Sequence, residues 1–351
     1  MDFALEIENW YVKNKRDLPW RDITNPYLIW VSEIILQQTR VAQGYDYYLR
    51  FVKHFPDVET LAAADEQDVL NVWQGLGYYS RARNLHSAAK TVAGQGRFPT
   101  TYKEVRALKG VGDYTAAAIC SFAYGLPFAT VDGNVYRVLS RFFGLETPID
   151  TTAGKRYFAE LAQQMLDKKN PGLYNQAIMD FGALQCTPKS PDCLSCPLYD
   201  ACCARMAGKI DDFPVKSKKT AVRNRFFVYV LIKNEEGLLM HRRGNGDIWQ
   251  GLYEPYLLEF SSPVDEGEVR KLLAEQFMTE DFILSGVVKG LSHVLTHRHL
   301  HVDCYELVSN VPLSIEGYTR IPLNELDAYP MSRLIHILFE KYSDMGLFQG
   351  R

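Results

Sequence analysis

The sequence of 351 residues lacks the features that mark several specialised classes of protein. It has no uninterrupted apolar run long enough to cross a bilayer as a helix, and no cleavable secretion signal opens it. Its formal net charge of −3 argues against a generally basic nucleic-acid binder. We therefore expect a soluble, cytoplasmic protein with no membrane partner, whose apolar residues, 47% of the chain, form ordinary globular cores.

The net charge is slightly negative, but basic side chains are concentrated in two stretches. Residues 76–110 contain seven lysine and arginine side chains against Glu104 as the single acid. Residues 205–225 contain seven basic and two acidic side chains. Each stretch either forms a local surface that attracts nucleic acid or is an ordinary solvated face, and charge alone leaves both interpretations open.

Cysteine is nearly absent outside one short stretch. Five of the seven cysteines lie between residues 186 and 203, whereas Cys120 and Cys304 stand in apolar stretches where core packing is expected. A cytoplasmic chain does not hold a disulfide framework, so the clustered thiols indicate a metal site. Four of them have the spacing C-x6-C-x2-C-x5-C, which suits either an iron–sulfur cluster or a four-cysteine zinc site: Cys186, Cys193, Cys196 and Cys202. Cys203 has no ligand role in this pattern.

Strand-like alternation is scarce in residues 1–208 and common after them. The first part has helical periodicity at 26–50, 65–74, 80–93, 101–107, 114–124, 134–143, 153–167 and 173–184. Residues 209–222 are polar and basic and are predicted to be a linker. In residues 223–351, helical stretches at 266–277 and 331–343 interrupt strand-like runs at 225–232, 237–243, 252–260 and 299–308. The sequence therefore predicts an all-α domain followed by an α+β domain.

One acidic residue stands in a run that otherwise predicts a buried helix. Glu33 lies within VSEIILQQT (31–39), and Asn25 and Pro26 suit the cap and first turn of its helix. Most of its neighbours three and four residues away are apolar. A carboxyl group there would be desolvated, which favours its neutral form.

Two glycines mark a hairpin between helices in LKGVGDYTAAAI (108–119). Gly110 and Gly112 follow a helix that opens with a capping box, Thr101 to Glu104, and precede a second helix. Such glycines let backbone N–H groups approach a phosphate closely, without reading base sequence. The alternative is an ordinary glycine turn between two helices.

A second acid, Asp132, precedes a helix in ATVDGNVYRVLSR (129–141). It either simply caps that helix or is a carboxylate that the first N–H groups of the helix keep ionised. In the second case it is ready to face a developing cation.

The order of these motifs resembles one superfamily. A helix–hairpin–helix, then VDGNV, then the four spaced cysteines is the layout of the endonuclease III superfamily of DNA glycosylases. The chain is most similar to its adenine DNA glycosylase branch, the MutY family, through LPWR (18–21), SEIILQQT (32–39), WQGLGYYSRARNL (73–85), GVGDYTAAAI (110–119) and VDGNV (131–135). The resemblance implies an all-α glycosylase domain, and a 4Fe–4S cluster on Cys186, Cys193, Cys196 and Cys202.

Two positions distinguish the MutY family from the bifunctional members of the superfamily. Bifunctional members of the superfamily carry a lysine nucleophile inside the hairpin motif, where this chain has Tyr114. Without that amine no Schiff base with the sugar is expected, so strand cleavage should be weak or absent. The second position is Glu33, which matches the catalytic acid of the MutY family.

The resemblance assigns the chemistry to two carboxyl groups. Adenine is a poor leaving group unless it is protonated, and a neutral Glu33 can donate that proton to N7. Asp132 then stabilises the oxocarbenium-like sugar as an anion. Tyr114 and Asn134 match residues that assist these two acids.

The resemblance also implies DNA-binding roles. Trp20, Arg21 and Gln176 line the adenine pocket. Gln38, Thr39, Leu76 and Tyr78 lie near the partner base, with the ring of Tyr78 as a wedge that fills the gap left by a flipped base. A buried core tyrosine is the alternative for Tyr78. Gly110 and Gly112 contact the phosphate backbone.

Residues 223–351 resemble the second domain of the MutY family, which has a Nudix-hydrolase fold. RGNGDIWQGLYEPY (243–256) is similar to the signature before the Nudix helix, but the acidic metal-binding box is absent from the residues after this stretch. We therefore expect that the fold is kept and nucleotide hydrolysis is lost. The loop that contacts 8-oxoguanine in the family, usually Phe-Ser-His, matches Leu295, Thr296 and His297, and the nearby pair Ser292 and His293 is the alternative match.

Together these observations predict a monomeric, monofunctional DNA glycosylase of base excision repair. It is expected to have a helical glycosylase domain at 1–208, a linker at 209–222 and a Nudix-like domain at 223–351. Its expected substrate is adenine opposite 8-oxoguanine or guanine in double-stranded DNA, which implies association with the nucleoid. The alternatives are a bifunctional lyase on oxidised pyrimidines, a catalytically silent binder of damaged DNA and a Nudix hydrolase.

Overall fold

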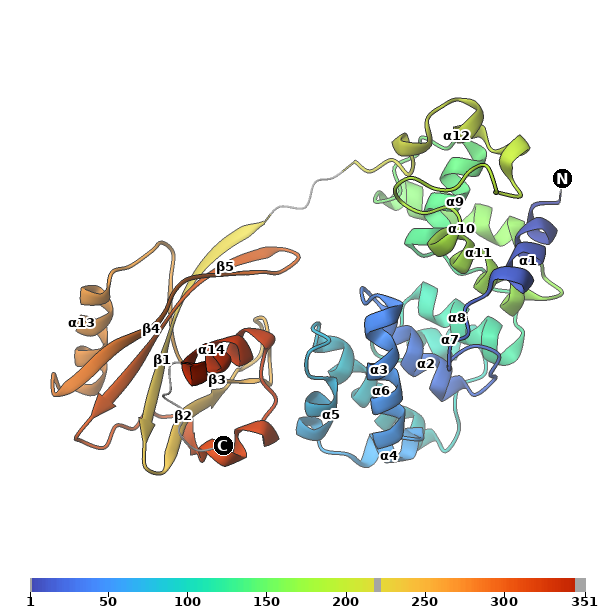
Figure 1. Ribbon diagram of the computed structural model, residues 1–351. Coiled ribbons are helices and arrows are strands. Elements are labelled where there is room, and N and C mark those ends of the chain that lie inside the picture. Colours follow the sequence, from blue (N-terminus) through green and yellow to red (C-terminus); the bar gives the residue numbers. More distant parts are fainter. Residues whose placement is uncertain (1, 218–221, 345–351) are drawn as a thin grey trace. The chain divides into compact units, whose positions relative to one another are not determined.

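The computed structural model describes residues 2–217 and 222–344, which form two compact units (Figure 1). The first unit is the described part of Met1–Ala63 and Asn84–Lys219. The second unit is the described part of Ala64–Arg83 and Thr220–Arg351. The second unit therefore includes a segment, 64–83, from the helical part of the sequence. The predicted domain boundaries themselves stay a prediction.

The first unit is built from helices. They are α1 (Phe3–Asn14), α2 (Pro26–Leu36), α3 (Val41–His54), α4 (Val58–Ala63), most of α6 (Ser80–Gln95), α7 (Tyr102–Ala107), α8 (Asp113–Tyr124), α9 (Gly133–Phe143), α10 (Thr152–Met165), α11 (Pro171–Leu184) and α12 (Cys203–Met206), with short 3-10 turns at Tyr199–Ala201 and Ile210–Asp212.

One hydrophobic core of this unit joins four helices. Phe3 and Ile7 of α1 pack with Leu139 of α9, Phe158 of α10 and Phe181 of α11, and all five are buried. Because Phe3 and Ile7 are four residues apart, they lie on one face of α1.

The helix starts follow the capping signals in the sequence. Oδ1 of Asn25 accepts hydrogen bonds from the N–H groups of Tyr27 and Leu28, and Pro26 begins α2. Thr101 and Glu104 form the predicted capping box of α7. Between α7 and α8, Gly110 has φ +80°, and a Cβ there would lie 2.7 Å from Cβ of Asn84, so only glycine fits.

One predicted helix is divided. The periodic stretch 26–50 breaks after Leu36, and Gln38 takes a left-handed backbone conformation with φ 59° before α3 begins at Val41. Residues 37–40 in the break are all polar, as an exposed turn within a longer helix would also be, so periodicity alone did not reveal it. Helices α1 and α4 were not predicted.

The second unit contains a six-stranded mixed sheet of order β4-β5-β1-β3-β2-β6. Its strands are β1 (Arg223–Asn234), β2 (Gly237–Arg242), β3 (Tyr253–Phe260), β4 (Phe282–Val294), β5 (Arg298–Ser309) and β6 (Tyr318–Ile321). Strands β1 and β5 pair in parallel, whereas the other neighbouring strands pair antiparallel.

Helices cover both faces of this sheet. Leu334 and Leu338 of α14 (Arg333–Asp344) pack with Tyr229 on one face, while Val269 and Leu273 of α13 (Glu266–Phe277) pack on the other. A 3-10 helix, η3 (Leu323–Ala328), precedes α14. Buried Cys304 belongs to the core beside α14, and Cys120 is buried in α8, as predicted.

Strands β4 and β6 were missed by the sequence analysis. β4 contains Gly286 and Gly290, and its pairing with β5 shifts register between Gly286 and Val288 and again between Val288 and Leu291. These irregularities interrupt the alternation of buried and exposed side chains on which strand prediction depends. β6 has only four residues, too few to give a periodic signal.

The segment 64–83 carries α5 (Glu66–Trp73) and the turn before α6. Side-chain amides of Gln67 and Asn71 on α5 donate to the carbonyl oxygen of Ala328, over 3.0 and 2.7 Å. Arg242 of β2 forms an ion pair with Glu66 at 2.9 Å. These contacts hold α5 in the second unit.

Candidate active site

A cavity of about 540 Å³ in the first unit brings together most of the predicted catalytic and adenine-binding residues. Side chains from α2, α8 and α9 and from the segment before α2 surround it. The predicted residues among its lining are Trp20, Arg21, Glu33, Thr39, Tyr114, Asp132 and Asn134.

Glu33 occupies the predicted buried position on α2. Its side chain is almost completely removed from solvent, with 5% exposed. The hydroxyl of Tyr114 donates a hydrogen bond to Oε2 of Glu33 over 2.6 Å. Burial raises the pKa of Glu33 above its ordinary value, and the bond from Tyr114 and the charge of Arg21 oppose this rise only in part. The structure thus favours a neutral acid at this position.

Asp132 is both the cap of α9 and part of the cavity wall. Oδ1 accepts hydrogen bonds from the N–H groups of Asn134 and Val135, each over 2.9 Å, and Oδ2 accepts one from the Asn134 side chain over 2.7 Å. Burial raises the pKa of Asp132 above its ordinary value, and these three hydrogen bonds oppose the rise only in part. Because every bond is donated to the carboxylate, the set stabilises its anionic form.

The wall next to Glu33 contains a buried ion-pair group that the sequence analysis missed. Asp180 of α11 is fully buried and bonds to Arg16 and, over 3.1 Å, to Arg21. Asp180 therefore fixes the guanidinium of Arg21. A signal was present, because Asp180 is an acid within an apolar helical run, the same pattern that singled out Glu33.

Some predicted residues do not line this cavity. Gln176 accepts a hydrogen bond from the hydroxyl of Tyr11 over 2.9 Å and is not among the lining residues. Gln38 lies in the break after α2 and is also absent from the lining. Gly110 and Gly112 lie in the exposed hairpin between α7 and α8.

A chain of hydrogen bonds leads from the cavity to the cysteine-rich loop. Arg137 of α9 donates to Oδ1 of Asn134 over 2.9 Å, and Asn134 in turn bonds to Asp132. The same guanidinium donates to the carbonyl oxygen of Cys186 over 2.8 Å. The position of Asp132 is thereby tied to the start of the loop.

The four spaced cysteines line one small cavity. Arg141, fully buried, donates over 3.4 Å to the sulfur of Cys186 and over 2.7 Å to the carbonyl oxygen of Thr187. Cys203 is exposed and does not line the cavity. Within residues 2–217 and 222–344, no group of three or more His, Cys, Asp or Glu side chains is arranged to hold a metal ion. The cysteines that line the cavity are Cys186, Cys193, Cys196 and Cys202.

A second pocket, of about 570 Å³, lies in the second unit. Tyr78 from the turn before α6 and Thr296 and His297 from the loop between β4 and β5 are among its lining residues. The hydroxyl groups of Tyr78 and Thr296 are hydrogen-bonded to each other. Leu76 is buried and is not part of the lining.

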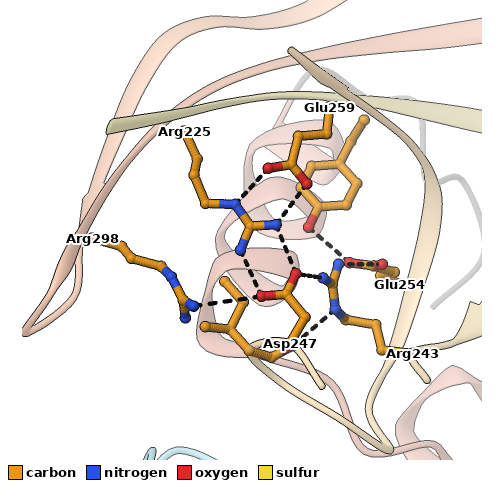
Figure 2. Close-up of polar contacts among 8 residues, drawn as sticks. Arg225, Arg243, Asp247, Glu254, Glu259 and Arg298 are labelled. Carbon is orange, nitrogen blue, oxygen red and sulfur yellow. Dashed lines mark hydrogen bonds and ion pairs between the residues drawn. The ribbon is translucent and has the colours of Figure 1, made fainter. Parts of the chain in front are cut away.

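Figure 2 shows a network of arginines and carboxylates, of which Asp247 and Arg298 also line this pocket. Arg225 forms ion pairs with Asp247 at 2.7 Å and Glu259 at 2.5 Å, and Arg243 pairs with Asp247 and Glu254, both at 2.6 Å. The hydrogen bonds from Arg225 lower the pKa of Asp247 to about 2. Each of these carboxylates, near the stretch that resembles the Nudix signature, is therefore bound by an arginine.

No helix in the described part of the chain is both long and apolar enough to span a membrane.

Comparison with known proteins identifies both parts of the chain. Residues 31–164 match the family model of the HhH-GPD superfamily base excision DNA repair protein, and residues 227–341 match that of the NUDIX domain. Among solved structures, a thermostable thymine-DNA glycosylase is 29% identical with a TM-score of 0.55, covering 58% of this chain and 95% of that one. The predicted fold class is thus confirmed.

Two curated relatives carry the same name. The adenine DNA glycosylase of Buchnera aphidicola subsp. Acyrthosiphon pisum (strain APS) is 33% identical over 254 residues, 72% of this chain and 73% of that protein. The adenine DNA glycosylase of Homo sapiens is 42% identical over 214 residues, 58% of this chain and 39% of that protein. With its two matching domains and this extent of similarity, the chain belongs to the adenine DNA glycosylase family of base excision repair enzymes.

Proposed function

We propose that this enzyme removes adenine paired with 8-oxoguanine or guanine in double-stranded DNA and leaves an intact strand with an abasic site. The observation that carries the proposal is the pair Glu33 and Asp132 in one cavity, each with a different set of hydrogen-bond donors. Burial raises the pKa of both acids, but Glu33 accepts one hydrogen bond and Asp132 accepts three, so the anion is supported more strongly at Asp132, as a division into proton donor and anion requires.

Glu33 protonates the leaving base. A buried carboxylic acid can give its proton to N7 of adenine, so that the base departs neutral. The hydroxyl of Tyr114, which donates to Oε2 of Glu33, then stabilises the carboxylate that forms. Tyr114 therefore assists the transfer without losing its own proton, since burial raises its pKa well above the ordinary value.

Asp132 stabilises the sugar. As the bond to adenine lengthens, positive charge develops on the sugar ring, and the anion of Asp132 offsets it. Asn134 holds Oδ2 of Asp132 over 2.7 Å and so fixes the direction of the carboxylate. Water then attacks the sugar and loses a proton to the carboxylate of Glu33, which restores the acid and leaves an abasic site.

The enzyme is proposed to be monofunctional. Strand cleavage in the related lyases requires an amine that forms a Schiff base with the sugar, and the matching position holds the phenol of Tyr114. The hydroxyl of Tyr114 is engaged with Glu33.

Recognition of DNA is assigned to groups outside the catalytic cavity, except for Thr39, which is part of its lining. The backbone at Gly110 and Gly112 grips phosphate, and Leu76 and Tyr78 support the stack next to the partner base. Gln38, Thr39, Thr296 and His297 contact the partner base. The side chain of Gln176 bonds to Tyr11, so its proposed role in binding adenine follows from the resemblance alone.

The four spaced cysteines are proposed to hold a 4Fe–4S cluster. Their donor set is four thiols around one cavity, which fits such a cluster. The resemblance to the endonuclease III superfamily, in which this spacing holds a 4Fe–4S cluster, favours that group over a single zinc ion. When bound, the cluster would join both ends of the loop 186–202, which begins just after α11.

The domain limits 1–208, 209–222 and 223–351, a monomeric state and association with the nucleoid remain part of this proposal. The paired carboxylates Asp247, Glu254 and Glu259 support a Nudix-like domain that recognises DNA rather than hydrolysing nucleotides, because each is already bound by an arginine.

The test uses three duplexes, with adenine opposite 8-oxoguanine, adenine opposite guanine, and thymine glycol opposite adenine. Each is incubated with the full-length protein, with and without hot alkali. We expect cuts in the first two duplexes only, and only after alkali. Cleavage of the thymine glycol strand, or strand scission without alkali, would reject the proposed substrate or the monofunctional mechanism.

A further inference from the structure

The turn that carries Tyr78 has an unusual backbone. Gly75, Gly77 and Tyr78 have φ values of 93°, 72° and 49°. A left-handed conformation suits glycine but is uncommon for tyrosine. The side chain of Tyr78 is 44% exposed, so core packing does not hold it in place. Other contacts must keep this turn in its conformation.

Tyr79, the next residue, supplies such contacts. Its hydroxyl accepts a hydrogen bond from the N–H group of Gly75 over 3.3 Å and donates one to the carbonyl oxygen of Met331 over 3.2 Å. The side chain of Tyr79 is buried. One hydroxyl thus links the start of the turn to a segment more than 250 residues away in the sequence.

Met331 contacts the turn through both of its peptide groups. Its N–H group donates to Oε1 of Gln74 over 3.2 Å, while its carbonyl oxygen accepts from Tyr79. Met331 is itself buried and bridges to Tyr253 at the start of β3. The turn is therefore attached, through Met331, to the start of the inner strand β3 of the sheet in the second unit.

From this geometry we propose that Tyr79 is a positioning residue for Tyr78. Through the main chain of Met331, the sheet-containing unit holds the turn in the conformation that presents the ring of Tyr78 to DNA. This inference rests on the proposed role of Tyr78 as the wedge beside the partner base. It gives residues 328–331 a part in DNA binding that is separate from base reading by Thr296 and His297.

A wedge that is poorly placed makes the complex with a flipped adenine less stable, so more enzyme is needed to form it, but at saturation the adenine is still fully flipped and Glu33 and Asp132 act unchanged. Loss of the Tyr79 hydroxyl should therefore weaken binding, leave the saturated rate of excision unchanged, and affect duplexes with 8-oxoguanine and guanine by the same factor.

The experiment is a double-mutant cycle with the full-length enzyme. Single-turnover excision of adenine opposite 8-oxoguanine and opposite guanine is measured against enzyme concentration for the parent, Tyr78→Ala, Tyr79→Phe and the double variant. Tyr79→Phe is expected to raise the half-saturating concentration about fivefold or more, with the saturated rate within about twofold of the parent. In the Tyr78→Ala background the same change should have almost no effect, because the residue through which it acts is gone.

Two further variants separate positioning from folding. Tyr27→Phe removes another buried hydroxyl that donates to a main-chain carbonyl oxygen, that of Phe55 over 2.7 Å, and should leave the half-saturating concentration unchanged. Gln74→Ala removes the acceptor of the Met331 N–H group and should reproduce the effect of Tyr79→Phe, which keeps the test valid if Tyr79→Phe folds poorly.

The outcomes are distinguishable. If Tyr78→Ala weakens binding but the penalties of Tyr78→Ala and Tyr79→Phe simply add, the positioning role of Tyr79 is overturned while the wedge stands. If Tyr78→Ala has no effect, the proposed wedge and the positioning role both fall. A change confined to the saturated rate would also overturn the inference.

Discussion

The hydroxyl of Tyr114 donates a hydrogen bond to Oε2 of Glu33 over 2.6 Å. The two residues are on different helices, α8 and α2, and both side chains line the same cavity. This contact couples the state of the proposed catalytic acid to a neighbour that favours its anion, while burial favours its neutral form.

Glu33→Gln should bind DNA with adenine opposite 8-oxoguanine but should not release the base. The amide keeps the shape of the side chain and has no proton to donate, so we expect a loss of about 1,000-fold or more in the single-turnover rate. A rate within tenfold of the parent would contradict the assignment. Binding is checked with the same duplex by electrophoretic mobility shift.

The pH dependence of excision should follow the protonation of Glu33. Because the acid must be protonated to act, the rate should fall as the pH rises through its raised pKa. Tyr114→Phe removes a hydrogen bond that favours the carboxylate, which should raise the pKa of Glu33 further. The falling limb of the pH–rate profile should therefore move to higher pH in Tyr114→Phe, and a shift to lower pH would contradict this account.

Asp132→Asn tests the negative charge of this side chain separately from its role as the cap of α9. Asparagine caps helices about as well as aspartate, so thermal stability should change little. The anion that faces the sugar is lost, and excision should fall by about 100-fold or more. Near-parental activity together with unchanged melting would show that Asp132 is only a helix cap.

Cys196→Ser and Cys203→Ser form a matched pair for the cluster. Cys196 lines the thiol cavity, whereas Cys203 is exposed and outside it. In protein purified anaerobically from an iron-replete host, Cys203→Ser should keep about four irons per chain, and Cys196→Ser should lose iron or fold poorly. Zinc in place of iron in the parent would reject the proposed cluster.

Glu8 should make stability depend on pH. Burial raises the pKa of this side chain on α1 to about 7, and the charges of Asp167 and Asp2 act in the same direction. Its Oε1 atom and the buried hydroxyl of Tyr174 have no hydrogen-bond partner among the described residues. The folded protein therefore binds the proton more tightly than the unfolded chain, and this contribution to stability is complete below about pH 4.5 and is lost as the pH rises through 7.

The variant that tests this is Glu8→Gln. It should raise the melting temperature by about 3–6 °C at pH 8 and change it little at pH 5. Glu6→Gln removes the same charge from the same helix and serves as the control. An equal gain at both pH values, or a gain from Glu6→Gln alone, would show that the environment of Glu8 is not responsible.

The parts of the fold that the sequence predicted are those with local signals. Asn25, Thr101 and Glu104 mark helix starts by capping chemistry that operates within four residues, and the structure contains these caps. Strand β4 was not predicted, because its pairing with β5 has two register shifts that interrupt the alternation of buried and exposed side chains. Neither Gly286 nor Gly290 can be recognised as part of a strand until β5 lies beside it.

The site was predictable where a single residue contradicts its surroundings. Glu33 is an acid in an apolar helix, and the structure buries it as expected. Asp180 offered the same contradiction, but its meaning depends on Arg16 and Arg21, more than 150 residues away. The hydrogen bond from Tyr79 to Met331 likewise joins distant segments, and no local sequence pattern in either segment indicates it.

The directions of two helices have a consequence for the two carboxyl groups. Glu33 lies in the last turn of α2, and Asp132 lies just before the first turn of α9. The C-terminal end of a helix carries partial negative charge and the N-terminal end partial positive charge. The same cavity therefore exposes one acid to a field that resists ionisation and the other to a field that supports it. The proposed roles of Glu33 as proton donor and Asp132 as anion therefore depend on the course of the main chain as well as on the two side chains, so we expect that Glu33→Asp and Asp132→Glu would not exchange these roles.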